Sequence, residues 1–143
     1  MYGMDKTVYA VVDTNVFVSA LLSRNPESCP LQILAHIYRG VIIPVFNDEI
    51  IAEYREVLSR EIFHFNPQDI EDALQTITTF GLSLNRTPAL NEVFPDAKDI
   101  VFYEVKMSKD DAYLVTGNKK HFPKKPFVVT PREMIEILKY SEN

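Results

Sequence analysis

The stretch V-Y-A-V-V-D-T-N-V-F-V-S-A-L-L, residues 8–22, places one carboxylate in the middle of an apolar segment. The residues before Asp13 are β-branched and aromatic without strict alternation, which predicts a strand over residues 7–12 that is buried on both faces. Residues 15–22 predict a short helix. Because desolvating a lone carboxylate costs several kcal/mol or forces it to take up a proton, we expect a partner to receive Asp13 in the folded protein.

The rest of the chain repeats this alternation of short buried strands and helices. Further strands are predicted at residues 41–45, 82–84, 112–115 and 127–129. Helices are predicted at residues 30–40, after the N-cap Asn47, from Pro67 to the stop at Gly81, at residues 100–105, and after the capping box that Thr130 and Glu133 form. This order predicts an α/β fold, a three-layer α/β/α sandwich with a central parallel sheet. We expect a single domain over residues 1–143, with its core at about 8–138.

Composition excludes several classes of protein. With 46% hydrophobic and 24% charged residues, the chain is neither disordered nor fibrous. The one cysteine, Cys29, excludes an intramolecular disulfide and a cysteine-based zinc site and fits a cytoplasmic location. Residues 8–22 are too short to span a bilayer and are interrupted by Asp13, so no membrane association is expected. The net charge of −5 should repel nucleic acid unless a local basic strip or bound cations compensate.

Polar residues follow two of the predicted strands at the point where each ends. Asp13, Thr14 and Asn15 follow the first, and Thr116 and Asn118 follow the strand at 112–115. Functional groups of parallel α/β sheets gather at these carboxyl ends, so the two clusters should face one crevice.

Three further acids can join that crevice. Glu53 lies at the border of its helix's apolar stripe, and Asp96 and Asp99 flank the start of the helix at 100–105. Neighbouring carboxylates repel one another unless a cation compensates, and oxygen ligands without cysteine or a placed histidine suit Mg²⁺ or Mn²⁺. The sequence therefore predicts a divalent-cation site that could bind phosphate esters. The competing interpretation is that Asp96 and Asp99 only cap a helix.

The chain resembles the PIN-domain ribonucleases, in particular the bacterial toxin components of toxin–antitoxin pairs. The resemblance covers about residues 8–138 and is strongest in V-V-D-T-N-V-F-V-S-A-L-L. It continues through N-D-E-I-I-A-E-Y-R-E-V-L, P-D-A-K-D, A-Y-L-V-T-G-N and V-V-T-P-R-E-M.

The resemblance assigns a role to each acid. It implies that Asp13, Glu53 and Asp99 are the first three metal-binding, catalytic acids and that Asp96 is an accompanying acid. It also implies that Asn15 is a supporting amide, beside the hydroxyls of Thr14 and Thr116. The implied activity is divalent-metal-dependent cleavage of single-stranded RNA by a protein that is often a homodimer and often held inactive by an antitoxin protein.

Two features depart from the family pattern. Asn118 occupies the place of the fourth acid, and an amide can offer a carbonyl oxygen to a metal but no negative charge. In the helix at 100–105, large or charged residues stand where small residues usually pack: Phe102, Tyr103, Glu104 and Lys106. Both departures predict weaker metal binding or lower activity.

A basic run follows the Thr-Gly-Asn corner and contains Lys119, Lys120, His121, Lys124 and Lys125. It is either a solvated loop or a phosphate-binding lip over the acids. Such a lip would provide local positive charge, which offsets the repulsion between the acidic protein and nucleic acid. Arg24 and Arg132 are candidates to join it as RNA contacts.

Two alternatives belong to other functional classes. One is an inactive PIN-like module that binds RNA or protein without cleavage, which Asn118 favours. The other is a phosphoryl-accepting receiver module, which would require a phosphorylatable aspartate directly after a central strand. The four glycines cannot form a G-x-G-x-x-G or phosphate-binding loop, which excludes dinucleotide and P-loop chemistry.

Overall fold

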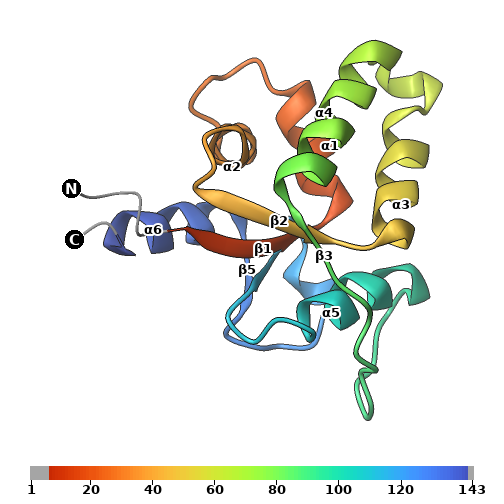
Figure 1. Ribbon diagram of the computed structural model, residues 1–143, viewed down its shortest axis with the longest axis vertical. Coiled ribbons are helices and arrows are strands. Elements are labelled where there is room, and N and C mark those ends of the chain that lie inside the picture. The colour runs from red at the N-terminus through yellow and green to blue at the C-terminus, as the bar shows by residue number, and fades with distance from the viewer. Residues whose placement is uncertain (1–6, 142–143) are drawn as a thin grey trace.

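The computed structural model describes residues 7–141 and contains a central parallel sheet (Figure 1). All strand pairs in it are parallel, and the strand order is β3-β2-β1-β4-β5. The strands are β1 (Val8–Val12), β2 (Ile42–Phe46), β3 (Leu82–Ser83), β4 (Tyr113–Val115) and β5 (Val128–Val129). Each lies within one residue of its predicted place, so the predicted α/β class is confirmed.

The helices form layers on the two faces of this sheet (Figure 1). They are α1 (Thr14–Leu22), α2 (Cys29–Tyr38), α3 (Asp48–Leu58), α4 (Pro67–Phe80), α5 (Ile100–Lys106) and α6 (Pro131–Ser141), with 3₁₀ turns η1 (Glu61–Phe63), η2 (Ala97–Asp99) and η3 (Lys119–His121). In Figure 1, α1, α3 and α4 lie above the sheet and α5 lies below it, while α6 packs against α2. The arrangement is the predicted three-layer sandwich.

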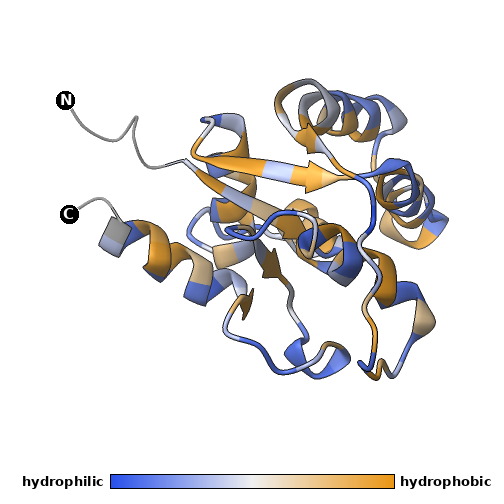
Figure 2. Ribbon diagram, turned by 60° about the horizontal axis from the view of Figure 1, so that its bottom comes forward, coloured by the Kyte–Doolittle hydropathy of each residue, from blue (hydrophilic) through white to orange (hydrophobic). Residues whose placement is uncertain are grey.

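Burial on both faces explains why apolar and polar residues do not alternate along the strands. Ala10, Val11 and Val12 of β1 are completely buried, because β1 pairs with β2 on one side and β4 on the other and helices cover both faces. Figure 2 shows the hydrophobic colour concentrated along the strands and the hydrophilic colour in the connecting loops. Buried apolar residues from Ala10 to Leu138 form one cluster.

The helix starts follow the capping signals in the sequence. Asn47 accepts a hydrogen bond from the backbone N–H of Ile50 (2.9 Å), and Asn66 accepts one from Gln68 (2.8 Å). Thr130 and Glu133 form the predicted capping box, each side chain accepting from the other's backbone N–H. The start of α2 differs by one residue, because Ser28 caps the helix and Pro30 is therefore inside its first turn.

Residue 81, directly after α4, is a glycine because there is no room for a side chain at this position. A Cβ atom on this residue would lie 2.4 Å from the carbonyl oxygens of both Ile77 and Pro44. The chain therefore passes directly from the helix into β3, beside β2.

The large residues of α5 are accommodated by specific polar contacts. Lys106 is buried, but its ammonium donates to the carbonyl oxygens of Lys109 and Asp110 and lies over the ring of Phe127. Glu104 accepts from the backbone N–H of Ala89 (2.7 Å) and so ties the loop before α5 to the helix. None of the helices within residues 7–141 is long and apolar enough to cross a membrane.

Candidate active site

The site lies where the order of the strands reverses. From β1 the chain proceeds to β2 and β3 on one side, and it then crosses to β4 on the other side. Val12 and Val115 are partners at the ends of β1 and β4, and the backbone N–H of Asp13 continues the pairing by donating to the Val115 carbonyl (2.8 Å). Such a switch point opens a crevice between the carboxyl ends of the two strands.

Thr116 is the partner that receives the buried Asp13. The side chain of Asp13 is 6% exposed, and its Oδ2 accepts a hydrogen bond from the hydroxyl of Thr116 (2.8 Å). The Thr116 oxygen in turn accepts from the backbone N–H of Asn118 (3.0 Å). Two short polar segments that are distant in sequence thus hold one carboxylate in place.

The charge on Asp13 remains costly despite this bond. The pKa of Asp13 is raised to about 6, mainly by burial and also by the charge of Asp99, while the hydrogen bond from Thr116 opposes the rise. A carboxylate kept in such a position gains stability from any cation that approaches it.

Asp99 is the second acid of the site, and it lies at the junction of η2 and α5. Its Oδ2 is buried and accepts no hydrogen bond from the part of the chain that the structure describes, although His121 Nδ1 lies 3.2 Å away, within ion-pairing range. Burial raises the pKa of Asp99, the imidazole of His121 opposes this, and the charges of Asp96 and Glu53 add to it.

Glu53 reaches the site from α3. It is half-buried, as its place at the border of the apolar stripe predicts, and its carboxylate accepts a hydrogen bond from Thr14 Oγ1 (3.3 Å). The neighbouring Tyr54 is buried and donates its hydroxyl proton to the carbonyl oxygen of Val12. This bond fixes α3 against the end of β1.

Asp96 and Asn15 have supporting positions. Asp96 is exposed and caps η2, because its side chain accepts a hydrogen bond from the backbone N–H of Lys98 (2.9 Å). It affects the site through its negative charge, which raises the pKa of Asp99. Asn15 accepts a hydrogen bond from the backbone N–H of Gly117 (3.2 Å). A Cβ on Gly117 would lie 3.3 Å from the Asn15 oxygen, so glycine permits this close approach.

The profile of the PIN domain matches residues 9–120. The chain belongs to the PIN domain family. PIN domains are generally nucleases and typically use divalent metal ions. No curated protein matches the chain. The matched range includes all five predicted metal-site residues, and it ends inside η3, before β5 and α6.

The donor set of this PIN domain fits a hard divalent cation. Asp13 and Asp99 repel one another, and Asp99 has a buried oxygen without a hydrogen bond from residues 7–141. Over that same range, no three side chains of His, Cys, Asp or Glu gather in a cluster that could hold a metal ion. Two acids still suffice, because Mg²⁺ is usually held by one or two carboxylates and keeps several of its waters.

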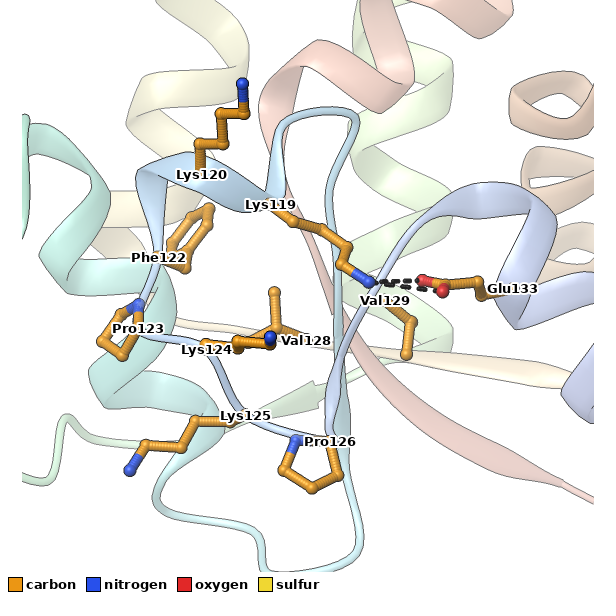
Figure 3. Close-up of a pocket in the computed structure, with 10 residues that line it drawn as sticks. All are labelled: Lys119, Lys120, Phe122, Pro123, Lys124, Lys125, Pro126, Val128, Val129 and Glu133. Carbon is orange, nitrogen blue, oxygen red and sulfur yellow. Dashed lines mark hydrogen bonds and ion pairs between the residues drawn. The ribbon is translucent and has the colours of Figure 1, made fainter.

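Lysines of the basic run line a hollow beside β5 (Figure 3). The hollow has a volume of about 780 Å³, and its lining includes Lys119, Lys120, Lys124 and Lys125 but none of the predicted metal-site acids. The hollow itself is therefore not a lip over the acids, whereas His121 of the same run contacts Asp99, and a phosphate-binding lip formed by the run stays a prediction. The chain turns back after η3 toward the start of β5 and carries the later lysines away from the end of β4.

The two arginines lie in different places. Arg132 is exposed in the first turn of α6, directly after β5, whose carboxyl end shares the edge of the sheet with the acids. Arg24 is exposed beyond the far end of α1, a helix about 13 Å long that starts at the acids. Arg24 can contact RNA, as predicted, only if the RNA strand extends from the acids along the whole length of α1.

His121 is the site residue that sequence reasoning did not single out. In the sequence it is one member of the basic run, and no other histidine stands at a ligand spacing from it. Its contact with Asp99 depends on the turn of η3, which brings the imidazole back over the start of α5. The only feature of the sequence that could have identified His121 as a site residue is its place just after the Thr-Gly-Asn corner.

Proposed function

We propose that this PIN domain is a divalent-metal-dependent endoribonuclease that cleaves single-stranded RNA by attack of water on a phosphodiester. Membership of the family supports nuclease activity. The observation that carries the metal dependence is a pair of mutually repelling carboxylates at the switch point of the sheet, the buried Asp13 and the half-buried Asp99, whose Oδ2 is buried.

The chain's own residues prepare the site for a cation and a phosphate. Thr116 holds Asp13 in one orientation, and Thr14 holds Glu53 beside the start of α1. Asp13 and Asp99 are the residues that would hold Mg²⁺ or Mn²⁺, with Glu53 and Asp96 near enough to act on Asp99 through their charges and the Asn118 amide as a further candidate ligand. A bound divalent ion supplies Lewis-acid stabilisation of phosphate charge and a water of lowered pKa.

In the proposed reaction, water attacks a phosphodiester bond of the RNA. The oxygen of water bonds to phosphorus, the bond from phosphorus to the 3′ oxygen breaks, and the proton lost by the water passes through solvent to the leaving oxygen. The products carry a 5′ phosphate and a 3′ hydroxyl. The proposed role of Glu53 is to orient the attacking water, which its half-buried carboxylate, anchored on one oxygen by Thr14, supports.

The test is cleavage of a 5′-labelled single-stranded RNA with Mg²⁺ or Mn²⁺ and with EDTA. We expect metal-dependent cleavage that falls at least a hundredfold in Asp13→Asn and Asp99→Asn. Glu136→Gln, which removes an exposed carboxylate on α6, is the matched control and should cleave normally. Unchanged activity in both site variants would refute the metal mechanism, and RNA binding without cleavage would favour the inactive binding module.

For the cellular role, the resemblance to toxins supports a second proposal. In this role the protein is a cytoplasmic, homodimeric toxin held inactive by an antitoxin protein. We expect its expression to arrest growth, and co-expression of a small protein from an adjacent reading frame to restore it. Arrest that persists in Asp13→Asn would show that RNA cleavage is not the cause.

A further inference from the structure

We infer that the hollow beside β5 is a second RNA subsite, which takes an unpaired base and its flanking phosphates from the strand that the acids cleave. The inference rests on the proposed nuclease function. It concerns a surface formed mainly by residues 122–133, beyond the part of the chain that the family profile matches.

The floor of the hollow suits a base. It is formed by Phe122, Val128 and Val129, which are buried, and prolines 123 and 126 stand at its rim (Figure 3). The volume of about 780 Å³ falls within the range of pockets that hold small ligands. Apolar and aromatic surfaces bind bases without sequence preference, because every base has a π-face.

The rim of the hollow suits phosphates. Lys119 forms an ion pair with Glu133 across the hollow, and Lys125 forms one with Glu92 (Figure 3 shows the first). Lys120 and Lys124 are exposed and form no ion pair with any residue in 7–141. These two ammonium groups are therefore available to contact the backbone of a nucleic acid without breaking an existing pair.

The position of the hollow connects it to the acids. Lys119 and Lys120 follow Asn118 directly, so η3 forms both the end of the acid site and one side of the hollow. In Figure 3 the Lys120 side chain extends from η3 away from the floor. An RNA strand that leaves the acids along η3 meets Lys120 first, then the apolar floor, then Lys124.

A peptide strand is a poorer occupant than RNA. An extended peptide would bind by adding to the free edge of β5, but β5 has only two residues and follows Pro126, which lacks a backbone N–H. Such an edge offers few main-chain hydrogen bonds. The apolar floor and the two lysines that form no ion pair within the described residues favour a single-stranded polyanion with bases.

The first experiment measures RNA binding rather than cleavage. Fluorescence anisotropy follows a labelled single-stranded 12-mer in EDTA, for the full chain and for Lys120→Gln and Lys124→Gln. We expect each variant to bind about three- to tenfold more weakly and to reduce the slope of log affinity against log salt by about 0.7. The control Arg39→Gln removes an exposed charge at the end of α2 and should leave affinity within twofold.

A second experiment tests the base. An oligonucleotide with abasic residues should bind about tenfold more weakly than the intact strand, because stacking is lost. Photocrosslinking of a 4-thiouridine RNA to the unmodified protein should map to the peptide that contains Phe122 and Pro126. This measurement needs no substitution in the core.

The outcomes separate the subsite from the nuclease. If the lysine variants bind like the control, if the abasic strand binds equally well, or if an acidic peptide displaces RNA from the crosslinked peptide, the subsite is wrong even when cleavage occurs. Lysine-dependent binding in a protein that never cleaves RNA would retain the subsite and refute the nuclease.

Discussion

Asp13 shows how one buried residue links stability to pH. Its pKa is raised from 3.8 to about 6 by burial, so the folded protein binds a proton more tightly than the unfolded chain. The stabilising effect of this proton is complete below about pH 4 and is lost as the pH rises through 6. We expect the free energy of unfolding of the metal-free protein to fall by up to about 3 kcal/mol over this window.

Asp13→Asn should remove most of that dependence, because an amide has no charge to desolvate. Urea unfolding from pH 4 to 8 in EDTA measures the effect, with Glu136→Gln as the control that keeps the wild-type profile. An equally steep profile in Asp13→Asn would show that other groups cause it.

Asn118 is the second prediction at the scale of a residue. Its amide occupies the place of an acid in the family pattern, and its backbone is held by Thr116. Asn118→Asp adds a negative charge beside Asp13 and should tighten Mn²⁺ binding about tenfold and raise the cleavage rate. Calorimetry measures the affinity directly, and no gain in affinity would mean that this side chain does not face the cation.

At the scale of elements, the hydroxyl of Tyr54 ties α3 to the end of β1. Tyr54 donates to the carbonyl of Val12, one residue before Asp13, and Glu53 is adjacent on the helix. Tyr54→Phe leaves that carbonyl without this donor and should cost about 1–2 kcal/mol of unfolding free energy.

The same variant should lower kcat more than it changes KM, because it loosens Glu53 without touching the RNA. Tyr38→Phe is the matched control, since Tyr38 is 54% exposed on α2. A loss of stability with normal kcat would show that Tyr54 only supports the core.

At the scale of the whole molecule, the acidic charge makes stability depend on divalent cations. The chain carries a net charge of −5, and the site concentrates carboxylates in a low-dielectric crevice. A cation that binds only the folded state at a hundred times its Kd adds about 2.7 kcal/mol of stability.

We therefore expect Mg²⁺ or Mn²⁺ to raise the Tm by several degrees over NaCl of equal ionic strength, measured by differential scanning calorimetry. The double variant Asp13→Asn/Asp99→Asn should lose this rise. A rise that persists in the double variant would indicate screening of the general surface charge instead of a site.

Local patterns predicted most of the fold. The hydrophobic runs of the strands, the caps at Asn47 and Thr130, and the glycine that follows α4 are each readable within a few residues of the position concerned. The position of the basic run relative to the acids has no such local cause, because it depends on the path of the loop after η3. That path is set by contacts with β5 and the loop before α5, such as the ion pair of Lys125 with Glu92.

By itself, the sequence determined the order of strands and helices, the burial of Asp13 and its need for a partner, because these follow from hydrophobic pattern and desolvation. Only the tertiary structure decided that the partner is Thr116, that His121 lies against Asp99, and that the lysines surround an apolar hollow. Contacts between residues far apart in the chain have no local signature, since they depend on how strands pair and loops return across the sheet.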